Sequence, residues 1–387
     1  MLLEDLPTPC LLIERRRLMQ NLDRMQAHAT AQAVALRPHV KTHKSIHIAR
    51  EQVARGAQGL TLAKPSEAAV FAEAGFCNLR IAYPVVGPTA HEQLLGLKAQ
   101  VSFCVDTTEG LHAAAPVYAA HDRTADVLLE VDTGYGRTGV PWDHADLVAL
   151  ARLVEETPGV RLVGLLTHAG QSYDGPQAGE TAEAALQRVA HEERDRLLEA
   201  AQRLHEAGVA AAQPGAFELS LGATPSIYHL ENRSYAGFRI TEIRPGTYVF
   251  MDGTQVGLGA ATWQDCALTV MATVVSKRRD ATGSERFYVD AGKKILTSDR
   301  RAGADGFGTL LYNPAAMVPM PHARLVKLSE EHGWGQVLGG ATLAVGDRVR
   351  IVPNHACVTV HTRSTCYLVD GEEVQASLSV DARDAVT

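Results

Sequence analysis

No stretch of the 387-residue sequence is apolar for long enough to cross a membrane. Basic residues are not in excess either, because 37 lysines and arginines face 44 acidic residues, for a net charge of −7. We therefore expect no binding to nucleic acid or to an anionic membrane surface. The first ten residues, MLLEDLPTPC, lack the positive charge and the apolar run of a secretion signal. The six cysteines have no repeated spacing, which is typical of reduced thiols in a cytoplasmic protein.

The sequence is long enough for two domains, and its pattern changes near residue 262. Up to that point, short β-rich runs alternate with amphipathic helical stretches. Eight strands separated by helices predict an α/β fold with a parallel (β/α)₈ barrel. After residue 262, apolar and polar residues alternate between turn signals, which predicts an all-β C-terminal domain. The runs that we assign to barrel strands are 34–36, 59–63, 79–86, 101–106, 126–132, 162–168, 217–222 and 242–250.

These patterns divide the chain into an N-terminal segment (1–20), a barrel (21–261) and a β domain (262–387). The N-terminal segment contains the strand-like stretch PCLLIE. The sequence leaves open whether this stretch joins the sheet of the β domain.

A basic run, ALRPHVKTHKS, follows the first predicted strand. Active sites of (β/α)₈ barrels lie at the carboxyl ends of the strands, so this run is placed to take part in chemistry. In an extended strand exit, Arg37, His39 and Lys41 would share one face, while Val40 would point into the core. Neighbouring positive charges disfavour the ammonium form of a lysine, which would make Lys41 a nucleophile toward an aldehyde. The alternative is a solvated basic patch.

Two glycine-containing turns near the end of the barrel, SLGATPS and RPGTY, carry hydroxyl side chains. Backbone N–H groups and hydroxyls in such turns bind phosphate, although tight βα turns alone would also explain them. His168 follows the sixth predicted strand. It is a candidate acid/base or ring-stacking group, or else a buried hydrogen-bonded histidine.

The stretch VPNHACVTVH places His355 and Cys357 two residues apart in the β domain. In an extended segment both side chains would lie on one face, and imidazole with thiolate suits Zn²⁺. Two protein ligands would leave coordination positions for water and substrate. Chance placement is the alternative. A metal-dependent barrel hydrolase would need more histidine and aspartate ligands at the strand ends than the sequence offers.

A series of motifs runs in order along nearly the whole chain: RPHVKTHK, EVDTGYGRTGV, LLTHAGQSY, RPGTYVFMD, VDAG, EEHG and VPNHAC. Together they resemble the D-threonine aldolase and D-serine dehydratase family. Members of this family are pyridoxal 5'-phosphate enzymes of the alanine-racemase-like fold type III. The resemblance implies that Lys41 bonds covalently to the cofactor and that His355 and Cys357 bind a divalent metal. It also implies cofactor contacts for Arg137, Gln171, Tyr173, Gly222, Thr224, Gly246 and Tyr248.

Two positions bear on the reaction. In the aldolase branch of the family the metal pair looks like His-x-Asp, and in the dehydratase branch it looks like His-x-Cys. This chain has a cysteine at the second position, Cys357. Aldolases also tend to carry a histidine where this chain has Ser172, just before Tyr173. We therefore expect dehydration of a D-3-hydroxy amino acid of the D-serine type to a 2-oxo acid and ammonia.

The resemblance leaves several points open. Zn²⁺ is the expected metal, with Mn²⁺ or Mg²⁺ as alternatives. D-threonine aldolase, D-threo-3-hydroxyaspartate dehydratase and a non-catalytic carrier of pyridoxal phosphate remain alternative functions. The family also implies a homodimer with shared active sites.

Overall fold

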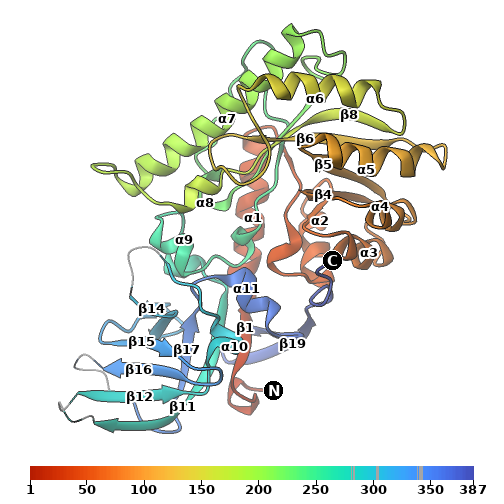
Figure 1. Ribbon diagram of the computed structural model, residues 1–387. Coiled ribbons are helices and arrows are strands. Elements are labelled where there is room, and N and C mark those ends of the chain that lie inside the picture. The colour runs from red at the N-terminus through yellow and green to blue at the C-terminus, as the bar shows by residue number, and fades with distance from the viewer. Residues whose placement is uncertain (280, 282–283, 302–304, 338, 340–342) are drawn as a thin grey trace. The chain divides into compact units, whose positions relative to one another are not determined.

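The computed structural model describes residues 1–279, 281, 284–301, 305–337, 339 and 343–387. The chain divides into two compact units. We call the first the barrel unit, which comprises Arg24–Lys41, Ile48–Gly246 and Asp384–Thr387. The second, the β unit, comprises Met1–Asp23, Thr42–His47 and Thr247–Arg383. Figure 1 shows the elements of both.

Eight parallel strands form the barrel unit in the sheet order β2-β10-β9-β8-β6-β5-β4-β3. A parallel bridge between His39 and Thr61 joins the two ends of this order, and Thr61 N–H donates to the carbonyl of Pro38 at 2.9 Å. The sheet is therefore closed, and the predicted fold class is confirmed. The strands are β2 (Ala35–Leu36), β3 (Leu60–Leu62), β4 (Asn78–Pro84), β5 (Gln100–Val105), β6 (Ala125–Asp132), β8 (Val160–Leu166), β9 (Glu218–Leu221) and β10 (Glu242–Ile243), with the short β7 (Val140–Pro141) paired to β6.

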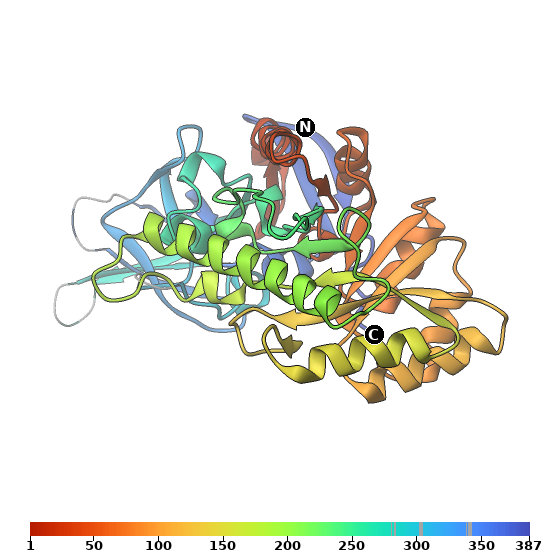
Figure 2. The ribbon, with the colours of Figure 1, turned by 90° about the horizontal axis from the view of Figure 1, so that it is seen from above.

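Helices connect these strands, and the long helix α7 runs beside them in the view from above (Figure 2). Thr181 caps α7, because its hydroxyl accepts the N–H of Ala184 at 3.1 Å. Among the helices of the described residues, none is long and apolar enough to cross a membrane. The helices in the first part of the chain are α1 (Arg15–Ala31), α2 (Ile46–Ala54), α3 (Pro65–Glu73), α4 (Pro88–Leu95), α5 (Thr108–Ala119), α6 (Ala145–Glu156), α7 (Ala182–Glu206) and α8 (Thr224–Ile227).

The eighth barrel strand is much shorter than predicted. The sequence suggests a strand over 242–250, but only Glu242–Ile243 is extended, and Thr247–Val249 forms the 3₁₀ helix η4. Pro245 has no N–H to donate to a sheet, which ends the pairing soon after the strand begins. The segment after β10 is therefore a loop at the strand end.

The β unit contains a ten-stranded sheet with the main order β14-β13-β17-β11-β1-β18-β19. Strand β1 pairs antiparallel with β11 and parallel with β18, so the stretch PCLLIE belongs to this sheet. The strands are β1 (Cys10–Glu14), β11 (Leu268–Arg279), β12 (Glu285–Val289), β13 (Thr309–Asn313), β14 (Val318–Pro319), β15 (Ala323–Leu328), β16 (Gly333–Val337), β17 (Arg348–Val352), β18 (Thr365–Asp370) and β19 (Glu373–Ser379).

The β unit differs from the predicted 262–387 in extent and composition. It begins at Thr247 and takes in two earlier stretches of the chain. Its described residues also include the short helix α9 (Gly253–Gly257), in a stretch predicted as barrel, and the short helices α10 (Lys293–Leu296) and α11 (Ala356–His361), where only strands were predicted. These helices have at most six residues, too few for a helical periodicity to stand out in the sequence.

Candidate active site

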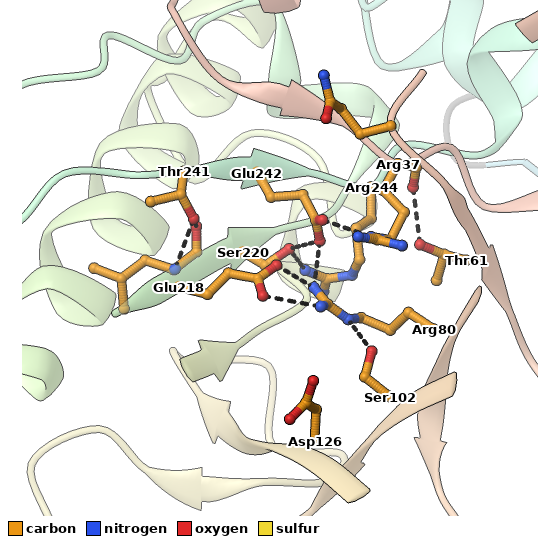
Figure 3. Close-up of polar contacts among 12 residues, drawn as sticks. Arg37, Thr61, Arg80, Ser102, Asp126, Glu218, Ser220, Thr241, Glu242 and Arg244 are labelled. Carbon is orange, nitrogen blue, oxygen red and sulfur yellow. Dashed lines mark hydrogen bonds and ion pairs between the residues drawn. The ribbon is translucent and has the colours of Figure 1, made fainter. Parts of the chain in front are cut away.

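A network of charged side chains fills part of the barrel interior, where such barrels usually pack apolar residues (Figure 3). Arg80 on β4 binds both Glu218 on β9 and Glu242 on β10. Nη2 of Arg80 lies 2.9 Å from Oε2 of Glu218, and Nη1 lies 2.6 Å from Oε1 of Glu242. Glu242 also binds Nε of Arg37 at 2.6 Å. Each buried charge faces an opposite charge, which offsets the cost of removing it from water.

The basic run at the end of β2 is therefore not a cluster of unmatched charges. Arg37 is 7% exposed and pairs with Glu242, 205 residues later in the chain. Burial alone would raise the pKa of Glu242, but its arginine neighbours hold it below its usual value. The predicted shared face of Arg37, His39 and Lys41 is wrong, because β2 ends before Arg37 and Val40–Thr42 forms the 3₁₀ helix η2.

The change Glu242→Gln should lower the free energy of unfolding by about 3–5 kcal/mol, because it leaves Arg37 and Arg80 buried without their shared countercharge. Urea denaturation monitored by circular dichroism measures this loss. The matched control is Asp126→Asn. Asp126 binds Arg161 at 2.6 Å, but that arginine is mostly exposed, so the control should cost about 1 kcal/mol or less. Equal losses for the two variants would contradict the importance of burial.

Lys41 lies in η2, in the loop after β2. This loop belongs to the edge formed by the carboxyl ends of the barrel strands, which we call the barrel rim. The side chain of Lys41 is exposed, and its backbone N–H donates to Nδ1 of His39 at 3.4 Å. Val40 is fully buried, as predicted. The charge of Lys41 is one of the influences that lower the pKa of His168. The amine of Lys41 and the imidazole of His168 therefore belong to the same part of the rim.

His168 follows β8, and its Nδ1 is hydrogen-bonded to the carbonyl oxygen of Gly222. Burial first, and then the charge of Lys41, lower the pKa of His168 to about 3. The bond to Gly222 acts in the opposite direction, and Arg137 and Arg244 add to the lowering. The ring is thus neutral near pH 7, with its proton on Nδ1 because a carbonyl can only accept. A neutral ring favours the ring-contact role over the general-acid role.

The TGYGRTG loop after β6 is shaped by Asp132. Its Oδ1 accepts the N–H groups of Gly134 and Tyr135, both at 2.8 Å. The Tyr135 ring meets the His168 ring edge-on, with centroids 6.2 Å apart. The guanidinium of Arg137 lies 5.6 Å from the centroid of the Tyr135 ring. The predicted cofactor contact Arg137 is therefore exposed on a loop that reaches His168 through Tyr135.

The loop after β8 continues into the 3₁₀ helix η3 (Gly170–Tyr173), which carries the predicted Gln171 and Tyr173. Nε2 of Gln171 donates to the carbonyl of Thr133 at 3.3 Å. Within the described part of the chain, Oε1 of Gln171 and the hydroxyl of Ser172 are buried without a hydrogen-bond partner. Buried polar atoms are nearly always satisfied, so these two atoms mark positions that a ligand would fill.

The turn after β9 has the features of a phosphate cradle. Thr224 and Ser226 belong to the first turn of α8, and among the described residues their buried hydroxyls have no hydrogen-bond partner. Backbone N–H groups at this helix start would donate alongside them. Gly222 precedes the turn, and a Cβ there would lie 3.3 Å from Cβ of Arg244. The close approach of Arg244 thus explains why the smallest residue occupies position 222.

Gly246 and Tyr248, the other predicted phosphate-side residues, fall in different units. Gly246 is the last residue of this stretch of the barrel unit, and Tyr248 lies in η4 of the β unit. His39 N–H donates to the carbonyl of Pro245 at 3.0 Å, which ties the loop after β10 to the loop after β2. Tyr248 is fully buried.

The predicted metal pair lies at the start of α11 in the β unit. His355 is the residue before the helix and Cys357 is in its first turn, so the predicted extended segment is wrong. The two side chains nevertheless interact. Burial disfavours the charged imidazole, but the hydrogen bond and the charge of Cys357 raise the pKa of His355 to about 10. Sγ of Cys357 also lies 3.3 Å from Oγ1 of Thr42, the residue that follows Lys41 in the sequence.

Acidic side chains hold this pair in place. Nδ1 of His355 is 2.7 Å from Oδ2 of Asp299, an arrangement common behind metal-binding histidines. Oδ2 of Asp252 accepts the N–H of Ala356 at 2.9 Å. The described residues contain no group of three or more histidine, cysteine, aspartate or glutamate side chains that could hold a metal ion. Of the predicted metal donors, the described residues thus bring together the imidazole of His355 and the thiol of Cys357.

The sequence reasoning missed five residues that shape the site. The sequence gave a signal for Glu193, because this acid lies with Arg194 on a buried stripe of α7 that is mostly apolar. Arg244 was visible within the quoted motif RPGTY but was not singled out. The sequence gave no signal for Asp299, whose partner His355 is 56 residues away. The five residues are Asp132, Glu193, Arg244, Asp252 and Asp299.

Comparisons with known proteins agree with this architecture. The family model described as "Alanine racemase, N-terminal domain" matches residues 13–253, and the one described as "Putative serine dehydratase domain" matches residues 267–369. The D-threo-3-hydroxyaspartate dehydratase of Delftia sp. (strain HT23) is 34% identical over 92% of this chain and 92% of its own length. The chain belongs to the D-threonine aldolase and D-serine dehydratase family. The resemblance inferred from the motifs is thereby confirmed.

Other members of the family show how broad its reactions are. The D-threonine aldolase of Arthrobacter sp. is 33% identical over 97% of this chain and 92% of its own length. A solved D-threo-3-hydroxyaspartate dehydratase has a TM-score of 0.86 and 32% identity over 98% of both chains. That structure is of a cysteine-to-alanine variant described as the metal-free form. The named relatives are lyases that share the fold type III of pyridoxal-phosphate enzymes, as predicted for this chain.

Proposed function

We propose that this chain is a pyridoxal-phosphate- and metal-dependent dehydratase that converts a D-3-hydroxy amino acid into a 2-oxo acid and ammonia. The contact between Cys357 and His355, with Asp299 behind the histidine, is the observation that carries this choice. A thiolate with an imidazole is a donor set that suits Zn²⁺ better than Mn²⁺ or Mg²⁺. A solved D-threo-3-hydroxyaspartate dehydratase, a cysteine-to-alanine variant described as the metal-free form, supports a role for a cysteine in metal binding.

The residues of the barrel rim fit pyridoxal phosphate. The unpartnered hydroxyls of Thr224 and Ser226 would bind the phosphate together with the N–H groups at the start of α8. The amine of Lys41 would bond to the aldehyde carbon, and Gln171 offers the buried Oε1 as a further contact. When bound, the cofactor supplies an aldehyde for amine attachment and a ring that takes up the electron pair released at Cα.

The chain's own residues would move one proton. Nζ of Lys41 accepts the proton that leaves Cα of the substrate, which requires the amine to be uncharged at that moment. His168 does not compete for that proton, because its pKa is about 3 and its Nδ1 is engaged by Gly222. The His168 ring instead holds the loop after β8 against the loop after β9.

His355 and Cys357 would hold the metal ion. Asp299 engages Nδ1 of His355, which directs Nε2 toward the metal-binding role. A divalent ion held there supplies the Lewis acidity that a hydroxyl needs to depart from Cβ.

Retro-aldol cleavage is the second candidate, because the Arthrobacter D-threonine aldolase matches nearly the whole chain. Two positions speak against it. The family resemblance associates a histidine at position 172 and an aspartate at position 357 with the aldolases, and this chain has Ser172 and Cys357. A non-catalytic carrier of pyridoxal phosphate would have no need of metal donors or of a region matching a serine dehydratase domain.

A product assay tests the proposal. The purified enzyme with Zn²⁺ should release ammonia and a 2-oxo acid in equal amounts from D-serine, D-threonine or D-threo-3-hydroxyaspartate. Pyruvate, 2-oxobutanoate and oxaloacetate are the respective 2-oxo acids, and the L-enantiomers serve as controls. Glycine with an equal amount of aldehyde, and no ammonia, would assign the chain to the aldolases instead. Among the three substrates, the rates identify the preferred one.

We also propose a homodimer, on the strength of the family resemblance alone. Sedimentation velocity of the purified protein, whose subunit mass is 41.6 kDa, distinguishes a dimer from a monomer.

A further inference from the structure

Glu193 is a buried acid in the middle of α7 that contacts two loops of the barrel rim. Its side chain is 1% exposed. Its Oε1 accepts the N–H of Ala169, in the loop after β8, at 3.0 Å. The same oxygen accepts the N–H of Gly222, in the loop after β9, at 3.3 Å. One atom of α7 is thus hydrogen-bonded to both loops.

Apolar packing joins the same three elements. Val189 lies one helical turn before Glu193 and forms one buried cluster with Ala169 and Ala223. The carbonyl of Gly222 is in addition bound by His168. Gly222 therefore uses its N–H to bind α7 and its carbonyl to bind the neighbouring loop, so a shift of either loop would disturb the other.

We propose that Glu193 is a positioning residue that holds the His168 loop and the Gly222–Ser226 turn in a fixed relation, and so keeps the cofactor cradle assembled. The identity of the cradle rests on the proposed function. The coupling of the two loops through Glu193 does not depend on the proposed function, and it is measurable without any substrate.

The geometry requires an acceptor oxygen at this position but no charge. A protonated carboxyl and a glutamine amide each keep a carbonyl oxygen that can accept both N–H groups, whereas leucine of similar size cannot. Burial raises the pKa of Glu193 to about 7, opposed by the two N–H groups and by the charge of Arg244. His168, a titratable group at the start of the loop after β8, stays neutral at this pH.

The sign of the resulting pH dependence follows from linkage. A carboxyl whose pKa is raised in the closed arrangement stabilises that arrangement while it is protonated, and the stabilisation is lost as pH rises through about 7. If opening of the loops exposes Glu193 to water, protection of the two amides should fall about tenfold between pH 6 and pH 8. Glutamine at this position cannot titrate, so its protection should not change with pH.

Hydrogen exchange with mass spectrometry tests the coupling in the full-length protein, with and without added pyridoxal phosphate. In Glu193→Leu, protection of the peptides that contain Ala169 and Gly222 should fall together, by about tenfold or more, because both N–H groups lose their acceptor. Glu193→Gln should retain protection and abolish its dependence on pH, after correction for intrinsic exchange. Glu206→Leu, at the exposed end of the same helix, is the matched control and should change neither peptide.

Unchanged protection in Glu193→Leu, or a change in only one of the two peptides, would overturn the proposal. If Glu193→Leu does not fold, Glu193→Ala, which also lacks the acceptor, takes its place, and unchanged protection of the two peptides in that variant would overturn the proposal. Titration with pyridoxal phosphate separates the two claims. A protein that binds none of it contradicts the proposed function, while the exchange result still reports on the coupling.

Discussion

Lys41→Ala should yield a folded protein that no longer holds pyridoxal phosphate covalently and whose activity has fallen by at least about a thousandfold. The amine is the only group of this side chain that can bond to an aldehyde or accept a proton. The visible absorbance of attached cofactor should therefore vanish. In the native enzyme, borohydride reduction followed by peptide mapping should place the label on the peptide that contains Lys41.

Two companion variants sharpen this result. Lys41→Arg keeps the positive charge but not the nucleophile, so it should fail as completely as alanine. Lys98→Ala removes an exposed lysine away from the rim and should leave the absorbance unchanged. A label found on any other lysine, or a visible band that survives in Lys41→Ala, would remove Lys41 from its proposed role and the dehydratase assignment with it.

Cys357→Ala should release the metal while the cofactor stays attached. Loss of the proposed thiolate ligand leaves His355 as the one remaining predicted donor, which is too little to retain Zn²⁺ through dialysis. We expect less than about a tenth of the native metal content and a loss of dehydration by at least about a hundredfold. Metal analysis by inductively coupled plasma mass spectrometry, together with the absorbance spectrum, measures both properties on one sample.

The control for this variant is Cys77→Ala, which removes an exposed thiol from the barrel unit. It should retain both metal and activity. Native metal content in Cys357→Ala would show that the thiol is not a ligand. Loss of cofactor and metal together would point to a structural role for Cys357, whose sulfur also contacts Thr42.

The strand and helix pattern of the barrel followed directly from the sequence. Runs such as DVLLEVD and LVGLLTH are buried on both faces of a parallel sheet, and that demand leaves a continuous apolar run in the sequence. The prediction of the eighth strand failed for most of its length. Tyr248 and Val249 are apolar and buried like strand residues, but they are buried in a 3₁₀ helix of the other unit. Their hydrophobicity correctly predicted that both side chains are buried, but it did not reveal that their backbone is helical and not extended.

Only some residues of the candidate site could be predicted from the sequence. Motif residues such as Lys41 and His168 could be named because local spacing and resemblance identify them. The partners that give them their properties are distant in the chain. Arg37 finds Glu242, and His355 finds Asp299, only once the chain has folded. A local run of cations therefore looked like mutual repulsion, whereas the fold supplies a countercharge.

The charged interior of the barrel restricts how this sequence can evolve. Arg80 on β4 binds one carboxylate on β9 and one on β10, neither of which is next to β4 in the sheet. Replacing any one member of this set alone by an apolar residue would leave the charge of another buried without its partner. Descendants should either inherit Arg37, Arg80, Glu218 and Glu242 as a block or lose them as a block. Substitutions at these four positions among related sequences should accordingly be rare and should occur together. Residues on the solvent-facing sides of the helices can change one at a time.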